Sequence, residues 1–142
     1  MAAALATPVS PHGRTGWSSI DAEVAELRRH FQSATTPQDY RAIGNDCVVV
    51  TEALSRHVFR PAKHLKPGEL EPPTANTKLR LERFIEAAAE RPSNLALRRL
   101  ARAVIEMAQT VKHSETPTRR EAGIAADAVI LLSNMLRRLD ER

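Results

Sequence analysis

The sequence predicts an all-α protein: an antiparallel bundle of about five helices that follows a disordered tail. Over most of the chain, apolar residues recur at alternating steps of three and four, the spacing that keeps side chains on one face of a helix. Glycine and aromatic residues are scarce and turn signals lie far apart, which argues against an all-β fold. A chain of 142 residues is long enough to bury the core of one domain.

Residues 1–16 carry prolines and glycines without an apolar period, so we expect a disordered tail followed by a single helical domain over residues 17–142. The apolar run near the start is too short for a signal peptide, and no basic region precedes it. The first helix is expected to begin at Ser18 or Ser19, because Ser18 and Asp21 approximate a capping box. Its apolar seam consists of Ile20, Val24, Leu27 and Phe31.

The second helix is expected to open at Thr36, which can cap it, with Pro37 at the first helical position and Asp39 three residues after the cap. A β-branched run over residues 48–51 would suit a strand, but the helical period continues on both sides of it, which favours a helix. The apolar seam of this helix is Tyr40, Ile43, Cys47, Val50, Leu54 and Val58.

The segment 60–76 holds four of the nine prolines and is expected to be the longest irregular part of the domain. Arg60-Pro61 ends the second helix, because the residue before a proline avoids the α conformation. A loop of this length is often functional or mobile. It can equally be a plain crossover between two long helices.

Three further helices are expected, over about residues 77–90, from Ser93 or Asn94, and after Pro117, where Thr118 and Glu121 form another candidate capping box. The fourth helix carries the seam Leu97, Leu100, Val104, Met107 and Val111. The fifth carries the seam Ala122, Ala125, Val129, Leu132, Leu136 and Leu139, and beside it a second stripe, Ile124, Ala128, Leu131 and Met135. A helix with two apolar stripes is buried on two sides, against several neighbours or against another subunit.

Motifs of catalysis and metal binding are missing from the sequence. It has no phosphate loop, glycine fingerprint or nucleophile elbow, and its five histidines lack the spacing of a helix-borne metal site, so no metal and no cofactor is expected. The single cysteine, Cys47, falls on an apolar seam and suits a small buried side chain in a reducing cytoplasm. No run approaches the ~20 apolar residues that span a bilayer, so we expect a soluble cytoplasmic protein.

The formal net charge of +4 comes from the C-terminal third of the chain. There Lys112 and His113 end the fourth helix, while Arg119 and Arg120 open the fifth. Cationic residues beside the free N–H groups of a helix start indicate an anion or phosphate site. Alternatively, Lys112 and His113 complement the negative end of the fourth helix, and Thr118 simply caps the fifth.

The chain places a long tyrosine-bearing helix, a proline-rich crossover and a penultimate helix ending in Val-Lys-His before an alanine-rich last helix. The long helix contains Tyr40-Arg41-Ala42-Ile43-Gly44-Asn45-Asp46-Cys47. Over about residues 36–139 this order resembles HEPN domains, helical bundles common in prokaryotic toxin–antitoxin, abortive-infection and other antiviral defence systems. Active members are often dimeric, metal-independent ribonucleases, and the resemblance implies that His113 stands in the place of their catalytic histidine.

The arginine of that family's catalytic signature has no counterpart here. It is separated from the histidine by four to six intervening residues, and at those positions this chain has Glu106, Met107 and Ala108. The nearest upstream arginine, Arg102, is separated from His113 by ten residues. The resemblance therefore carries over at most to His113, and it implies an inactive member that binds or dimerises.

We therefore expect a non-catalytic helical interaction or dimerisation module of a prokaryotic defence or regulatory system, which self-associates through its last helix or binds a protein partner. The alternative is a HEPN-like, metal-independent ribonuclease or RNA-binding protein that uses the basic turn around His113. Its candidate binding residues are Lys112, His113, Arg119, Arg120 and Arg102. A DNA-binding helix-turn-helix is less favoured, because the last two helices look long and mutually antiparallel.

Overall fold

The computed structural model describes residues 15–90 and 92–141, and every regular element in this part of the chain is a helix. The all-α prediction is therefore confirmed. The helices are α2 (Ser18–Ser33), α3 (Pro37–Val58), α4 (Pro61–His64), α5 (Thr77–Ala88), α6 (Ser93–His113) and α7 (Arg119–Leu139). The short α4 was not predicted, since it lies in the proline-rich segment that we expected to be irregular. Most of the expected disordered tail, residues 1–14, lies outside the described residues.

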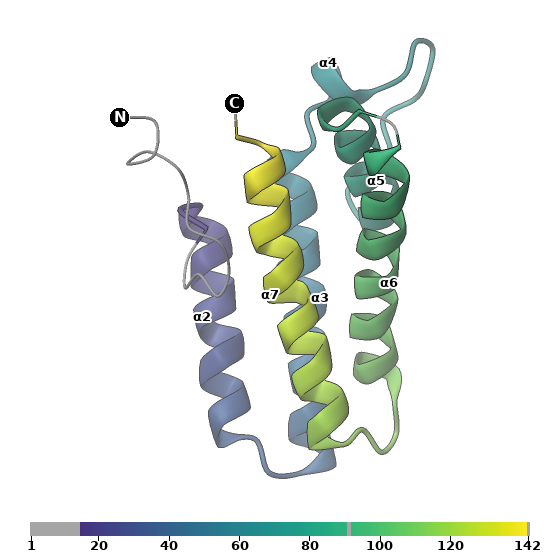
Figure 1. Cartoon of the computed structure of the whole chain (residues 1–142). Helices are drawn as coiled ribbons and strands as arrows, with labels where there is room; N and C mark the ends of the chain where they lie inside the picture. Colours follow the sequence, from purple (N-terminus) through teal and green to yellow (C-terminus); the bar gives the residue numbers. More distant parts are fainter. Residues whose placement is uncertain (1–14, 91, 142) are drawn as a thin grey trace, which may run out of the picture.

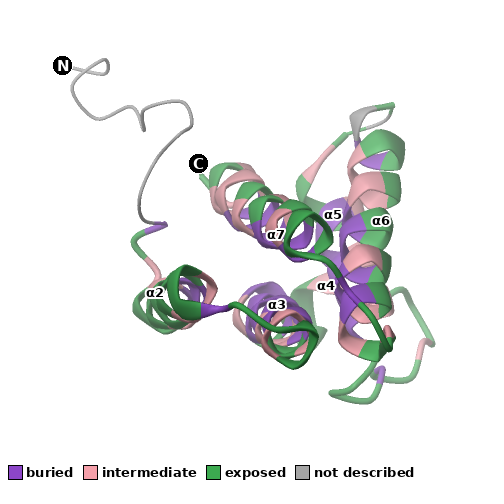
Figure 2. Ribbon diagram, turned by 90° about the horizontal axis from the view of Figure 1, so that it is seen from below, coloured by how far each residue is buried: buried purple, intermediate pink, exposed green. Residues whose placement is uncertain are grey.

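Four long helices lie side by side and alternate in direction along the chain (Figure 1): α2 and α6 run one way, and α3 and α7 run the other. The central helix is α3, which contacts α2, α5, α6 and α7. Seen end-on, the buried faces of the helices point toward one another and the exposed faces point outward (Figure 2). The α2–α3 and α6–α7 links lie at the same end of the molecule, and the crossover that contains α4 lies at the other (Figure 1).

The buried positions of α3 and α7 follow the predicted seams. In α3 every seam residue from Ile43 to Val58 is buried, and in α7 all of the seam except Leu139 is buried. The β-branched run over residues 48–51 is helical, as expected. Because its seam is buried and four helices contact it, α3 forms the centre of the core.

The predicted seam of α6 was partly wrong. Leu97, Leu100 and Met107 are only half-buried, whereas the fully buried line runs through Ala101, Val104, Ile105, Ala108 and Val111. The reason is that α6 packs against α3, α5 and α7 together, so its buried face is broad and includes small alanines that let the neighbouring helices approach. Met107 is left at the edge of the core.

Gly44 marks the closest approach of α3 to α6. A Cβ atom at this position would lie 2.4 Å from the backbone nitrogen of Lys112 and 2.7 Å from the carbonyl carbon of Val111. Both are backbone atoms, so a rotamer change could not relieve the overlap. The contact therefore holds the last turn of α6 directly on the backbone of α3.

Of the two candidate capping boxes in the sequence one is present and one is not, and Thr36, which was expected to cap α3, also forms such a box. Thr36 with Asp39 caps α3, and Thr118 with Glu121 caps α7, each by a reciprocal pair of hydrogen bonds. At α2 the expected Ser18–Asp21 box is absent.

At the start of α2 the carboxylate of Asp21 reaches back beyond Ser18. It accepts hydrogen bonds from the N–H and the hydroxyl of Thr15, both at 2.7 Å, and from the N–H of Gly16 at 3.0 Å. Gly16 has a φ of +87°, a left-handed conformation that suits glycine and turns the chain back toward the helix. Next to it, the ring of Trp17 stacks on His57 of α3, with ring centroids 4.4 Å apart.

The crossover between α4 and α5 is held in place by two arginines of α5. The buried Arg80 donates hydrogen bonds to the carbonyls of Pro72 at 2.9 Å and Pro73 at 3.1 Å. Arg83 donates to both carboxylate oxygens of Glu69 at 2.9 Å. The segment is therefore irregular but well anchored. Among the described helices, none is both long enough and apolar enough to cross a membrane.

Candidate functional site

The turn between α6 and α7 carries four of the five residues that the sequence singled out for anion or nucleic-acid binding. Lys112 and His113 belong to the last turn of α6, and Arg119 and Arg120 begin α7. The turn lies at one end of the molecule (Figure 1). Its position is fixed by the contact of Gly44 with the end of α6.

The start of α7 is capped by the chain itself. The hydroxyl oxygen of Thr118 accepts a hydrogen bond from the N–H of Glu121 at 3.1 Å, and Glu121 Oε1 accepts one from the N–H of Thr118 at 3.0 Å. The hydrogen bonds that the Glu121 carboxylate accepts, first from the Thr118 N–H and then from the Thr118 hydroxyl, lower the pKa of Glu121 below its ordinary value. A phosphate at this helix start would meet an ionised carboxylate, which repels it, so capping accounts for the residue types found here.

Arg119 contacts the C-terminal end of α2, far from it in the sequence. Its guanidinium lies over the ring of Phe31 in α2, 4.3 Å from the centroid, and donates a hydrogen bond to the carbonyl of Ala34 at 3.2 Å. A cation over an aromatic face is attracted by the ring quadrupole, which makes that face electrostatically negative. Arg119 therefore fastens the start of α7 to the end of α2.

The remaining four candidates do not form one cluster. His113 is exposed, and its Nε2 lies 3.1 Å from Oε1 of Gln109, one turn back on the same helix. Lys112 is half-buried beside α3, and Arg120 is exposed on α7. Arg102 pairs with Glu82 of α5, with 3.5 Å between nitrogen and oxygen.

Arg102 and His113 also lie far apart along α6. At about 1.5 Å of rise per residue, the eleven steps from Arg102 to His113 correspond to ~16 Å along the helix axis. One substrate phosphate could not contact both side chains. The arrangement does not replace the arginine that the HEPN catalytic signature would place near His113.

Other reactive side chains are committed to structural contacts. Cys47 is buried in α3, and burial raises the pKa of its thiol to about 12, so it carries no thiolate near neutral pH. His30 of α2 pairs with Asp46 of α3 at 2.7 Å and joins the two helices. Within residues 15–90 and 92–141, no three His, Cys, Asp or Glu side chains come together in a group that could hold a metal ion.

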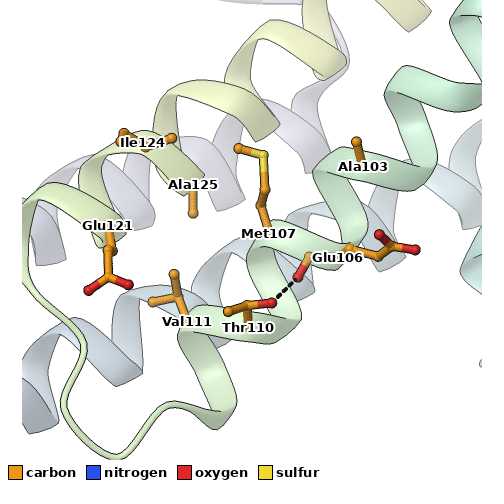
Figure 3. A pocket seen from close by; sticks show the side chains of 8 residues that line it. All are labelled: Ala103, Glu106, Met107, Thr110, Val111, Glu121, Ile124 and Ala125. Carbon is orange, nitrogen blue, oxygen red and sulfur yellow. Dashed lines mark hydrogen bonds between the residues drawn. The ribbon is translucent and has the colours of Figure 1, made fainter.

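A hollow of about 380 Å³ lies between α6 and α7, close to the basic turn. Figure 3 shows the side chain of Met107 pointing from α6 toward α7, with the carboxylates of Glu106 and Glu121 to either side. The lining is mainly apolar and consists of Ala103, Glu106, Met107, Thr110, Val111, Glu121, Ile124 and Ala125. It is an open surface groove with two acidic residues on its rim.

The apolar surface continues from the groove along the outer side of α7. Ile124 is 50% exposed and Leu131 is 44% exposed, while Ala128 and Met135 between and beyond them are half-buried. We call these four residues the α7 stripe. The seam residues of α7 from Ala122 to Leu136 are at most 2% exposed, so the stripe differs clearly from the buried seam of the same helix.

The sequence indicated the stripe but not the groove. The spacing of Ile124, Ala128, Leu131 and Met135 showed that a second face of α7 is apolar. It left open whether neighbouring helices cover that face, and in the structure Ile124 and Leu131 remain about half exposed. The groove depends on Met107 lying at the edge of the α6 core, which the seam prediction had placed inside it.

Comparisons of this chain with protein-family models, with curated proteins and with solved structures gave no match. Its function is therefore argued from the groove and the α7 stripe.

Proposed function

We propose that this chain is a non-catalytic helical interaction module that self-associates through the α7 stripe and the adjoining groove. The observation that supports it is the half-exposure of Ile124 and Leu131 on one line of a helix whose other face is completely buried. Burying a leucine or isoleucine side chain fully is favourable by ~1.5–3 kcal/mol, and half of that gain is still open at each of these positions. A protein surface that covers the stripe would bury these side chains and gain the remaining free energy of burial.

The candidate anion-binding residues support this proposal indirectly. Arg119 and Arg102 have contacts within the chain that explain their positions, so they are not needed for a ligand. A role in a prokaryotic defence or regulatory system, which the resemblance to HEPN domains implies, belongs to the same proposal. Inactive members of that kind would act by binding rather than by cleavage.

The test compares the protein with two leucine variants by size-exclusion chromatography and light scattering over micromolar concentrations. Wild type is expected to show a concentration-dependent mass above that of one chain. Leu131→Glu, which places a charge in the stripe, should shift the protein to a monomer without unfolding it, because the residue is 44% exposed. Leu70→Glu is the matched control, since Leu70 is 88% exposed on the crossover and outside the stripe. A wild-type protein that stays monomeric throughout would overturn the proposal.

The ribonuclease or RNA-binding alternative rests on the exposure of His113 and Arg120. We propose it only as a second function, because two exposed cationic side chains attract phosphates weakly. Incubation of the protein and of His113→Ala with RNA under metal chelation tests it. Cleavage or salt-sensitive binding that the substitution abolishes would support the alternative, and neither result in the wild type would exclude it.

A further inference from the structure

The outer line of α7 has a spacing that reads the same in both directions. It runs Glu121, Ile124, Ala128, Leu131, Met135 and Arg138, with steps of three, four, three, four and three. The four central residues are the α7 stripe. An acidic residue closes one end and a basic residue closes the other, so the line has opposite charges at its two ends.

A line of this kind matches a second copy of itself placed in the opposite direction. In a two-fold symmetric contact, residue i meets residue j and residue j meets residue i. With the axis at the midpoint of the stripe, Ile124 lies opposite Met135 of the second copy, and Ala128 lies opposite its Leu131. The same register brings Glu121 opposite Arg138, twice in each dimer.

We propose that the occupant of the α7 stripe is a second copy of this chain, packed with its α7 antiparallel in this register. The inference rests on the proposed function, since it requires self-association, and it adds the direction and register of the contact. Ala128 near the centre of the line is small and lets the two helices approach closely.

The neighbouring helix α6 carries the same charge polarity. Arg99, Ala103 and Glu106 follow a helical spacing that places them on one face of α6, the face that borders the groove. Glu106 and Glu121 line the same groove. Because α6 and α7 run in opposite directions (Figure 1), Arg99, two turns before Glu106 on α6, lies toward the end of α7 that carries Arg138. Antiparallel packing places unlike ends together, whereas parallel packing would place acid on acid and base on base. Electrostatic repulsion therefore selects the antiparallel dimer.

The intrachain contacts of these charges are compatible with the dimer. Arg138 pairs with Glu141 at 3.7 Å and Glu106 pairs with Lys78 at 3.2 Å, with all four side chains well exposed. Exposed ion pairs of this kind contribute ~0–1 kcal/mol, so a guanidinium can be shared with an incoming carboxylate at small cost. Glu121 is ionised and fixed in place by its cap, so its charge is already positioned for an incoming arginine.

Disulfide trapping tests the register. Ile124→Cys and Met135→Cys are prepared as separate proteins, mixed, and oxidised with oxidised glutathione. The native Cys47 need not be removed, because it is buried. In the proposed register each new cysteine meets the other kind, so the mixture should give a disulfide-linked heterodimer. Each variant alone should give little, because identical cysteines would lie ~16 Å apart along the helix axis, beyond the Cα separation of about 4.4–6.8 Å that a disulfide needs.

The possible outcomes distinguish failure of the proposed register from failure of the proposed function. Strong homodisulfides in the separate variants would show a parallel contact and overturn the register. A dimer by light scattering under reducing conditions, without a mixed disulfide, would also overturn it and leave self-association intact. A monomer by light scattering, in the wild type and in both variants, would overturn the register and the proposed function together.

Discussion

Gly44 is the residue that sets the distance between the two most extensively packed helices. Glycine inside a helix is ordinarily less favourable than alanine by about 1 kcal/mol, because it loses more backbone freedom on folding. Here that cost is offset by an approach of α3 to the backbone of α6 that no other residue permits. Propensity and packing therefore make opposite predictions for a substitution at this position.

We expect Gly44→Ala to lower the free energy of unfolding by about 1–3 kcal/mol, the usual cost of overpacking, despite the gain in helix propensity. The added methyl would lie 2.4 Å from the Lys112 backbone nitrogen, so α3 and α6 must move apart. Urea unfolding followed by circular dichroism measures the change. Gly123→Ala is the control, because its methyl would lie 3.3 Å from the ring edge of Phe31, a side chain that can move. A Gly44→Ala variant as stable as wild type would contradict the close contact.

Arg119 shows why individual site residues could not all be predicted. In the sequence it follows a cap and precedes another arginine, which indicates an anion site. Its partners in the structure, Phe31 and Ala34, are about ninety positions earlier in the chain. Only the packing of α2 beside α7 brings them together, and no local pattern encodes that contact.

At the scale of single elements, local rules predicted helix starts well where the cap lies within four residues. Thr36 with Asp39 and Thr118 with Glu121 are such cases. At α2 the expected start at Ser18 is confirmed, but the expected cap is wrong, because Asp21 accepts hydrogen bonds from Thr15 and from Gly16, a left-handed glycine. The buried face of α6 was also misplaced, because three neighbours rather than its own period decide which residues are covered.

The crossover gives a prediction at the same scale. Hydrogen bonds from Arg83, and then from the backbone of Lys66, lower the pKa of Glu69 from 4.5 to about 2. A carboxylate with a lowered folded-state pKa contributes stability that is fully present above its unfolded pKa and is lost as the pH falls through its folded pKa. Glu69 therefore contributes above about pH 4.5, and its contribution disappears between pH 4.5 and pH 2.

We expect Glu69→Gln to be less stable than wild type at neutral pH, with the gap in melting temperature closing as the pH falls from about 4.5 toward 2. Thermal unfolding at a series of pH values measures both curves. Glu115→Gln, which removes an exposed carboxylate from the α6–α7 turn, should keep the wild-type pH profile. A gap that stays constant with pH would contradict the role assigned to the Glu69–Arg83 pair.

At the scale of the whole molecule, α2 is an outer helix on a core centred on α3. It packs mainly against α3, with a smaller contact to α7, and buries only Ile20, Val24 and Leu27. Three side-chain contacts join it to its neighbours: Trp17 with His57, His30 with Asp46, and Phe31 with Arg119. By contrast α3 is covered by four helices.

We expect α2 to open before the rest of the molecule, because opening exposes few buried side chains. Its amide protons should exchange with solvent faster than those of α3 in native-state hydrogen exchange. Arg119→Met, which removes the contact with Phe31, should speed exchange in α2 selectively, while the matched Arg120→Met should not. Equal protection of α2 and α3 in the wild type would show that the two helices unfold as one unit.

The candidate interaction surface could be predicted only in part, because its exposure depends on how the helices assemble. Helical spacing identified Ile124, Ala128, Leu131 and Met135 as a second apolar stripe, and that required no structure. Whether the stripe is covered depends on how many helices surround α7, which is a property of the assembled fold. Four helices pack against α3, whereas one side of α7 is left open.

The stacking of Trp17 on His57 has a consequence for spectroscopy. Trp17 is the only tryptophan in the chain, and it stands at the first turn of α2 against α3. Tryptophan emission from this protein therefore observes the docking of one outer helix, while circular dichroism observes all of them. Agreement of the two signals during unfolding would indicate a single cooperative transition, and an earlier change in emission would time the release of α2.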